Sequence, residues 1–274
     1  MAVDLAPLWD FANPQVSEQR FRAALPSARG DDVLILQTQI ARTYGLRGDF
    51  VRAREILNDM QLEKAGAEPR VRHALELGRT YASAAHPKES QTPEARARAR
   101  ALYVQAFELA RKEKLDALAI DAIHMLAFVD TAPADQLKWA QEALALVEAS
   151  TQPAAKRWEA SLRNNAGYAL HQLGRYEEAL GQFKQAVVLR ERGSDAQATR
   201  VAHWMVARTL RAMGRVDEAL EVQLRLEQEF EAAGKPDPYV FEELELLYRA
   251  KGDERRATEY SNKRNLQAGG KPNP

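Results

Sequence analysis

Residues 158–191, WEASLRNNAGYALHQLGRYEEALGQFKQAVVLRE, decide the fold that this chain can adopt. The first half of the stretch carries apolar side chains at helical spacing and ends at Gly174, a residue that readily takes the left-handed conformation closing a helix. The second half carries another apolar stripe, and acidic residues occupy its first turn, where they stabilise the helix dipole. The stretch therefore predicts two amphipathic helices joined by a tight turn.

The same turn recurs along the chain, because a Gly is followed five residues later by an Ala at four places. These pairs are Gly48 and Ala53, Gly174 and Ala179, Gly214 and Ala219, and Gly252 and Ala257. A Tyr or Leu stands four residues before each Gly. Repetition at this scale indicates one helical hairpin copied several times, and such hairpins stack on their neighbours to bury a continuous core.

The hairpin at residues 158–191 resembles the tetratricopeptide repeat (TPR) family. The family pattern is a small residue, an aliphatic or aromatic residue three positions later, then Gly, an aromatic residue, Ala, an aromatic residue and Ala. These places are held by Gly167, Leu170, Gly174, Tyr176, Ala179, Phe183 and Ala186. The resemblance covers residues 31–263, and the equivalent Ala residues are 38 to 46 positions apart. Because the usual period is about 34, the chain resembles the long-helix subgroup with repeats of roughly 40 residues, such as kinesin light chains and bacterial peptide-sensing regulators.

The resemblance implies an all-α fold, a right-handed α-solenoid of about six TPR helix-turn-helix hairpins with an N-terminal capping helix. We expect residues 1–30 to form the capping half-repeat, residues 31–263 the solenoid and residues 264–274 a disordered tail. The hairpins are expected at residues 34–67, 71–112, 115–149, 158–191, 198–233 and 238–263.

The composition narrows the classes of function. Lys and Arg number 39 and Asp and Glu also number 39, so the chain lacks the basic excess typical of nucleic-acid-binding proteins. The absence of cysteine excludes disulfides and thiolate metal sites. No apolar run is long enough to span a membrane and no cationic segment opens a signal peptide, so we expect a cytoplasmic protein. Abundant Ala and Arg indicate a bacterial source.

The sequence offers no arrangement suited to catalysis. The five His residues include no pair at i and i+4 and no HExxH motif, and no GxSxG motif occurs. Paired acids such as Glu177 and Glu178 lie near expected helix starts, where the helix dipole accounts for them. We therefore expect a protein that is not an enzyme and that uses no metal ion and no cofactor.

In the TPR family the first helix of each hairpin lines a concave groove, and the residue after the small position points into it. The resemblance therefore implies groove residues at Arg42, Arg79, His124, Tyr168, Arg208 and Leu246. Neighbouring turns of the same helices add Asn164, Asn165, His171, Trp204 and Arg211. Guanidinium groups pair with carboxylates, and asparagine amides can hold a peptide backbone. We therefore expect the groove to bind an acidic or carboxylate-terminated segment of a partner protein.

Two other interpretations of these groove residues stay open. The arginines can pair with acids on adjacent helices, such as Glu76, Asp121 and Glu242, to form a structural ion-pair network. Alternatively, a segment of the chain itself can fill the groove. Trp204 is likewise consistent with core packing or with contact to a ligand.

Two functions compete with a non-catalytic interaction scaffold. The first is a regulatory sensor module that controls a partner chain. The second is a small-molecule-binding protein or an enzyme that uses an arginine, histidine and tyrosine site at Arg79, His124 and Tyr168.

Overall fold

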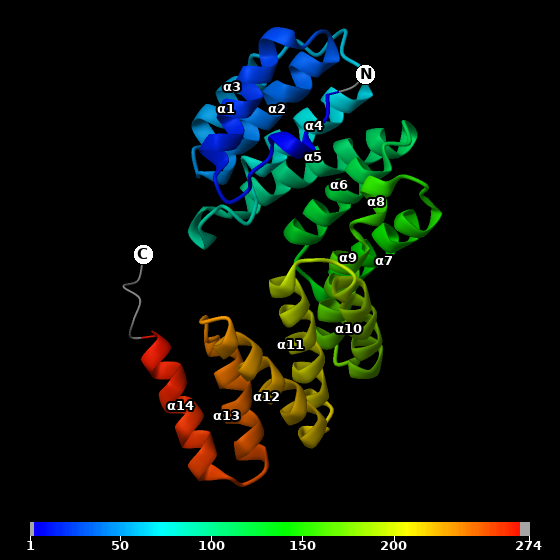
Figure 1. Cartoon of the computed structure of the whole chain (residues 1–274). Coiled ribbons are helices and arrows are strands. Elements are labelled where there is room, and N and C mark those ends of the chain that lie inside the picture. The colour runs from blue at the N-terminus through cyan, green and yellow to red at the C-terminus, as the bar shows by residue number, and fades with distance from the viewer. Residues whose placement is uncertain (1–2, 269–274) are drawn as a thin grey trace. The chain divides into compact units, whose positions relative to one another are not determined.

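The computed structural model describes residues 3–268, and within this range the chain is helical with no β-strand (Figure 1). The chain divides into two compact units, which we name unit 1 (described residues 3–158) and unit 2 (described residues 159–268). Each unit has its own stack of helices and its own apolar core.

Unit 1 contains eight α-helices and three short 3-10 helices within residues 3–158. They are η1 (Ala6–Leu8), α1 (Pro14–Ala24), η2 (Leu25–Ser27), α2 (Asp31–Leu46), α3 (Phe50–Asn58), α4 (Ala67–Arg79), η3 (Lys88–Ser90), α5 (Pro93–Lys112), α6 (Asp116–Val129), α7 (Pro133–Ala149) and α8 (Pro153–Lys156). Three hairpins follow one another, α2 with α3, α4 with α5, and α6 with α7. Helix α2 also packs on α4, and α5 packs on α6, so the hairpins form one stack.

Unit 2 contains six α-helices within residues 159–268. They are α9 (Glu159–Gln172), α10 (Tyr176–Glu191), α11 (Ala196–Ala212), α12 (Val216–Ala232), α13 (Pro238–Ala250) and α14 (Glu254–Ala268). These helices form three more hairpins, α9 with α10, α11 with α12, and α13 with α14. Helix α10 packs on α11 and α12 packs on α13, as in a helical solenoid. The predicted all-α fold of about six helix-turn-helix hairpins is thereby confirmed.

Helix α1 packs against α2 and closes the amino-terminal side of unit 1, as expected of a capping helix. Its Phe21 is fully buried in a cluster with Leu36 and Ile40 of α2. Because α1 covers apolar residues of α2 that would otherwise face water, it supplies the apolar contact that a first repeat lacks.

The tight turns that the sequence predicts depend on glycine at the positions where the chain reverses. Gly174 has φ of +72° and Gly214 has φ of +76°, a region that L side chains rarely adopt. At the first of these turns the backbone N–H of Arg175 donates to the carbonyl of Leu170 at 2.9 Å, which satisfies one of the last carbonyls of α9.

The carboxyl-terminal helix is longer than the sequence indicates. Residues 264–268 were expected in a disordered tail, but α14 continues to Ala268. Two ion pairs fix this last part of the helix, Lys263 to Glu227 at 2.7 Å and Arg264 to Glu245 at 3.2 Å. The remainder of the expected tail, residues 269–274, lies outside the described residues.

Small residues allow the two helices of a hairpin to approach closely, and this gives a first prediction. A Cβ added to Gly167 would lie 2.7 Å from Cε1 of the fully buried Phe183. Gly167→Ala is therefore expected to destabilise the protein by about 1–3 kcal/mol through overpacking. The exposed Gly181 of α10 has no such neighbour within 4 Å, so Gly181→Ala is expected to stabilise it by about 0.5–1 kcal/mol. Urea denaturation of both variants measures the two changes in the free energy of unfolding. Equal changes of the same sign would contradict the close contact between Gly167 and Phe183.

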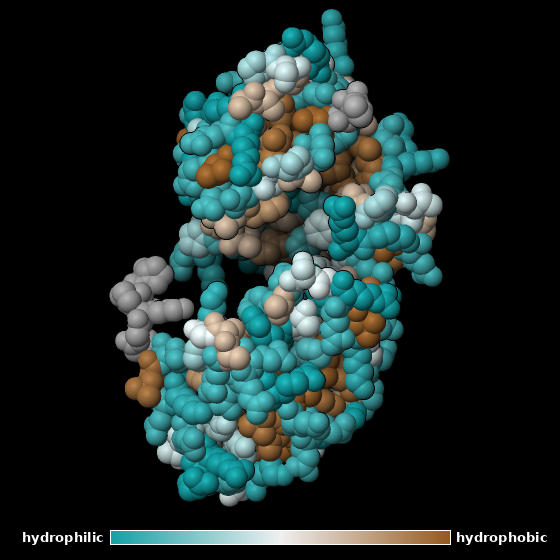
Figure 2. Space-filling model, in the orientation of Figure 1, coloured by the Kyte–Doolittle hydropathy of each residue, from teal (hydrophilic) through white to brown (hydrophobic). Residues whose placement is uncertain are grey.

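Hydrophilic residues cover most of the face shown in Figure 2, and hydrophobic residues form separate patches on both units. This pattern is typical of amphipathic helices that bury one side against their neighbours. Among the helices of residues 3–268, none combines the length and the apolar character needed to cross a membrane.

Candidate partner-binding surface

The residues expected in the groove lie on the first helices of the hairpins, divided between the two units. Unit 1 holds Arg42 on α2, Arg79 on α4 and His124 on α6. Unit 2 holds the others: Asn164, Asn165, Tyr168 and His171 on α9, Trp204, Arg208 and Arg211 on α11, and Leu246 on α13.

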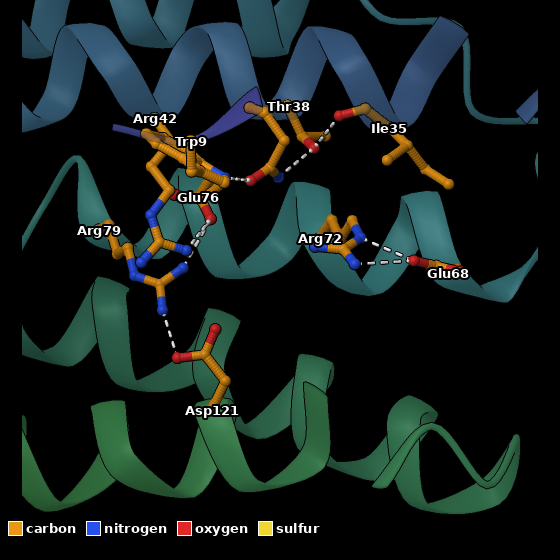
Figure 3. Close-up of polar contacts among 10 residues, drawn as sticks. Trp9, Ile35, Thr38, Arg42, Glu68, Arg72, Glu76, Arg79 and Asp121 are labelled. Carbon is orange, nitrogen blue, oxygen red and sulfur yellow. Dashed lines mark hydrogen bonds and ion pairs between the residues drawn. The ribbon is translucent and has the colours of Figure 1, made fainter. Parts of the chain in front are cut away.

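In unit 1 the arginines form ion pairs with acids of the same helix and of adjacent helices (Figure 3). Arg79 pairs with Glu76 at 2.6 Å and, from another nitrogen, with Asp121 of α6 at 2.5 Å. Arg42 reaches the same oxygen of Glu76 at 3.4 Å. The carboxylate of Glu76 is only 4% exposed, so these contacts replace its lost hydration.

The charges of this cluster balance, with two guanidinium groups facing two carboxylates. Burial alone raises the pKa of Asp121, but the charges of Arg79 and Arg42 outweigh it and hold the pKa below its usual value. Burial lowers the pKa of Arg79, whereas Asp121 and Glu76 together hold it above its usual value. The geometry of Arg42 and Arg79 therefore matches the ion-pair network that the sequence left open.

A segment of the chain itself covers part of this cluster. The guanidinium carbon of Arg42 lies 5.6 Å from the ring centre of Trp9 and 5.8 Å from that of Phe11, within the range of cation–π attraction. The Trp9 indole N–H donates to Oε1 of Gln39 at 3.2 Å. The amino-terminal segment thus occupies one side of Arg42, as in the interpretation of a groove filled by the chain's own residues.

A cavity of about 180 Å³ lies beside the same cluster and is lined by residues of α2, α4 and α6, among them Arg42, Glu76, Arg79 and His124. The ring of His124 lies 5.5 Å from that of Trp158. Glu76 and Asp121 both pair with Arg79 here, whereas Arg42 reaches Glu76 only at 3.4 Å and its buried Nε has no hydrogen-bond partner among the described residues. Most of the charge beside the cavity is therefore neutralised by ion pairs.

Three partly buried histidines predict how the stability of unit 1 depends on pH. Burial lowers the pKa of His73, His86 and His124 below 6.5, which means that the folded state disfavours their protonated form. Below about pH 6.5 the unfolded chain binds more protons, so stability is expected to fall as the pH drops from 7 to 5. Asp121 has a lowered pKa, so its contribution persists in this range and is lost only at more acidic pH. Thermal melts at several pH values check this, with a flatter profile expected for His124→Gln. A melting temperature independent of pH would contradict it.

In unit 2 Arg211 is engaged in an ion pair. Its guanidinium binds both oxygens of Glu243 on α13, at 2.7 and 2.9 Å, and Glu243 is 5% exposed. The partner is thus Glu243, one position after the Glu242 that the sequence suggested, which is exposed.

Arg208 differs from these paired arginines. Within residues 3–268 no carboxylate lies within ion-pair distance of it, and its guanidinium carbon instead lies 5.4 Å from the ring centre of Trp204. Trp204 is partly exposed, and its indole N–H donates to the carbonyl of Tyr239 at 3.3 Å. Trp204 is therefore partly exposed, and its ring is fixed by the hydrogen bond to Tyr239. The guanidinium of Arg208 lies against this fixed ring.

The neighbouring helix α9 contributes polar and aromatic groups. Burial lowers the pKa of His171, and the charges of Arg208 and Arg211 lower it further, so these groups lie close together. The Nε2 atom of His171 is buried and has no hydrogen-bond partner among the described residues. Tyr168 is 41% exposed, whereas Asn164 and Asn165 are partly buried.

Sequence reasoning missed Arg200, which stands four residues before Trp204 on α11. Its guanidinium carbon lies 4.7 Å from the ring centre of Phe230, and its Nε is buried without a hydrogen-bond partner in the described part of the chain. The repeated spacing of four residues from Arg200 to Trp204 to Arg208 could have identified it, because such residues share one helix face.

Metal binding requires several ligating side chains at one place. In the part of the chain that the structure describes, no group of three or more His, Asp or Glu residues could hold a metal ion.

Residues 158–228 match the family model described as tetratricopeptide repeat. No curated protein matches the sequence.

Solved structures share the fold at low sequence identity. A signal transduction ATPase with a tetratricopeptide repeat sensor, from Pyrococcus horikoshii, superposes with a TM-score of 0.71 and 14% identity over 93% of this chain. This chain spans 39% of the length of that protein. The apo form of RapI gives a TM-score of 0.70 and 12% identity over 98% of this chain and 76% of its own. A Rap protein complexed with Competence and Sporulation Factor gives a TM-score of 0.58 and 18% identity, over 93% of this chain and 70% of the Rap protein.

The matched residues 158–228 comprise α9 to α11 and most of α12, and the solved structures extend the fold to the remaining hairpins. Over residues 158–228 the chain matches the tetratricopeptide repeat family, and over the remaining hairpins it shares the fold of the solved structures.

Proposed function

We propose that this chain is a non-catalytic scaffold that binds an extended segment of a partner protein on one face of unit 2. This face lies on the first helices of the three hairpins, α9, α11 and α13. Its residues are Tyr168, His171, Trp204, Arg208 and Leu246. The proposal rests mainly on the surroundings of Arg208. Its guanidinium lies beside the ring of Trp204, and no carboxylate among residues 3–268 is within ion-pair distance of it.

The contrast between the two units supports this location. Arg79 in unit 1 is held by two carboxylates and Arg211 in unit 2 by one, so an incoming anion would have to displace an existing ion pair. Arg208 can bind a carboxylate without such a loss. A charge-assisted hydrogen bond of this kind contributes about 1.5–3 kcal/mol.

Exposed apolar surface adds to the case. Tyr168 is 41% exposed and Leu246 is 37% exposed on the first helices of their hairpins. Among proteins of similar fold, one Rap protein is complexed with Competence and Sporulation Factor, so this architecture does bind such factors elsewhere. We therefore propose a protein or peptide partner whose segment presents a carboxylate to Arg208.

Charge reversal tests the proposal. The tagged full chain is used to capture partners from source cells, and bound proteins are identified by mass spectrometry. The wild-type chain is expected to retain a partner that Arg208→Glu loses. Arg255→Glu is the matched control, since Arg255 is exposed on α14, and it is expected to behave as the wild type. Undiminished capture by Arg208→Glu would contradict the proposed site.

A regulatory sensor is the second candidate, favoured by the similarity to a signal transduction protein in which tetratricopeptide repeats form the sensor. In that case the captured partner would itself carry an effector activity, and adding this chain would change that activity. A partner whose activity is the same with and without the chain would favour a simple scaffold. We do not propose the enzyme alternative, because Arg79 is committed to Glu76 and Asp121.

A further inference from the structure

Helix α11 carries two arginines without an ion pair among the described residues, Arg200 and Arg208, on either side of Trp204. Arg200, Trp204 and Arg208 follow at intervals of four and so form a stripe on one face of the helix. Neither arginine has a carboxylate in ion-pair distance within residues 3–268. Both guanidinium groups lie over aromatic rings, and the buried Nε of Arg200 has no hydrogen-bond partner there.

An apolar cavity of about 230 Å³ opens beside this stripe. Its walls come from α11, α12 and α13, and they include Val201, Trp204, Phe230, Tyr239 and Val240. At its mouth Val201 is 45% exposed and Tyr239 is 65% exposed. A cavity of roughly 150 Å³ accepts a benzene molecule, so this one can hold a large apolar side chain. Arg200 lines this apolar cavity, and Arg208 lies over the ring of Trp204, which is another of its walls.

We propose that this stripe and cavity, named the α11 site, bind a partner segment in which one apolar residue has a carboxylate residue two positions away on each side. The inference rests on the proposed function and specifies the chemistry of the partner. The apolar side chain enters the cavity beside Trp204, and the two carboxylates pair with Arg200 and Arg208.

The spacing of the stripe fits an extended segment. Four residues of α-helix advance about 6 Å along the axis, and two residues of an extended chain advance about 6.6 Å. Alternate residues of an extended chain also point to the same side. Three alternate side chains of the partner therefore match Arg200, Trp204 and Arg208 in register, whereas adjacent acids would point to opposite sides.

The charges around the site favour carboxylates as the flanking groups. The only acid lining the cavity is Asp237 among the described residues, and its Oδ1 is engaged by the backbone N–H of Tyr239 at 2.8 Å. Asp237 therefore caps α13, and among the described residues it forms no ion pair with Arg200. Charge complementarity thus selects an acidic segment, and the apolar cavity selects one with a large side chain at its centre.

Synthetic peptides test the register directly, by calorimetric titration of the full chain. The first peptide has the core Glu-Ser-Leu-Ser-Glu, and the second has the same composition in the order Glu-Glu-Ser-Ser-Leu. The first is expected to bind at least about ten-fold more tightly than the second, as one lost charge-assisted bond predicts. Equal binding of the two peptides would overturn the proposed register.

Substitutions in the chain locate the binding. Arg200→Gln and Arg208→Gln are each expected to weaken binding of the first peptide about ten-fold or more. Val201→Glu, which places a carboxylate at the cavity mouth, is expected to abolish it. Arg255→Gln on α14 is the matched control and should leave the affinity unchanged. Circular dichroism melts confirm that each variant is folded. Wild-type affinity in Val201→Glu would place the peptide elsewhere and overturn the proposal.

The outcomes separate this inference from the proposed function. If Arg208→Glu loses its cellular partner but the first peptide binds no better than the second, the α11 site fails and the scaffold proposal stands. If neither partner nor peptide depends on Arg208, both fail. The alternative occupant of the α11 site is a second copy of the chain. If sedimentation equilibrium shows a dimer that Val201→Glu dissociates, the acidic-segment proposal is overturned.

Discussion

Replacing Arg79 with Met is expected to lower the free energy of unfolding by about 3–5 kcal/mol, the largest effect of any single charge change in unit 1. Glu76 is 4% exposed and Asp121 is 12% exposed, and Arg79 is the nearest charged partner of both. Removing the guanidinium leaves two buried carboxylates close to each other, with Arg42 at 3.4 Å from Glu76 as the remaining cation. Urea denaturation followed by circular dichroism measures the change.

Two comparisons make this result specific. Arg52→Met removes an arginine of an exposed pair with Glu55 and is expected to leave the denaturation midpoint unchanged. The triple variant Arg79→Met, Glu76→Gln, Asp121→Asn removes the stranded charges and is expected to recover part of the loss. If Arg79→Met unfolded at the same urea concentration as the wild type, the buried network would not contribute to stability as described.

Replacing Phe183 with Ala is expected to destabilise unit 2 by about 3–5 kcal/mol. The Phe183 ring is fully buried and fills the seam between α9 and α10 against Gly167. Its removal leaves a cavity lined by apolar residues of both helices. Urea denaturation again measures the loss.

The same pair gives a sharper test through coupling. In the Phe183→Ala background the atoms that a Cβ at position 167 would meet are absent, so Gly167→Ala is expected to lose its penalty. The two substitutions are therefore non-additive, as expected of residues in contact. If the two changes in the free energy of unfolding simply added, the Phe183 ring and Gly167 would not be in contact as described.

Much of the fold could be predicted from the sequence because its cause is local. Gly174 at φ of +72° and the close approach of Gly167 to Phe183 are fixed by residue size and backbone freedom. The end of α14 could not be predicted in this way, because Arg264 is held by Glu245, a residue of another helix. The end of α14 is polar and shows no apolar periodicity, so a sequence pattern does not reveal a helix that ion pairs stabilise.

The site could be predicted only as a set of residues on the first helices. The register placed Arg42, Arg79 and Arg208 in equivalent positions, but their surroundings differ. Arg79 meets Asp121, whereas Arg208 meets the ring of Trp204. Which arginine is neutralised depends on side chains of neighbouring hairpins, and a repeat register alone does not distinguish them.

Position-specific photo-crosslinking in source cells tests most directly whether unit 2 binds its partner through the first helices of its hairpins. A benzophenone amino acid replaces Tyr168, Leu246 or, on the second helix α10, the 48% exposed Val188. We predict one and the same covalent partner at positions 168 and 246, none at position 188, and loss of the adduct when Arg208→Glu is added. An adduct at position 188 alone, or one indifferent to Arg208→Glu, would contradict the account.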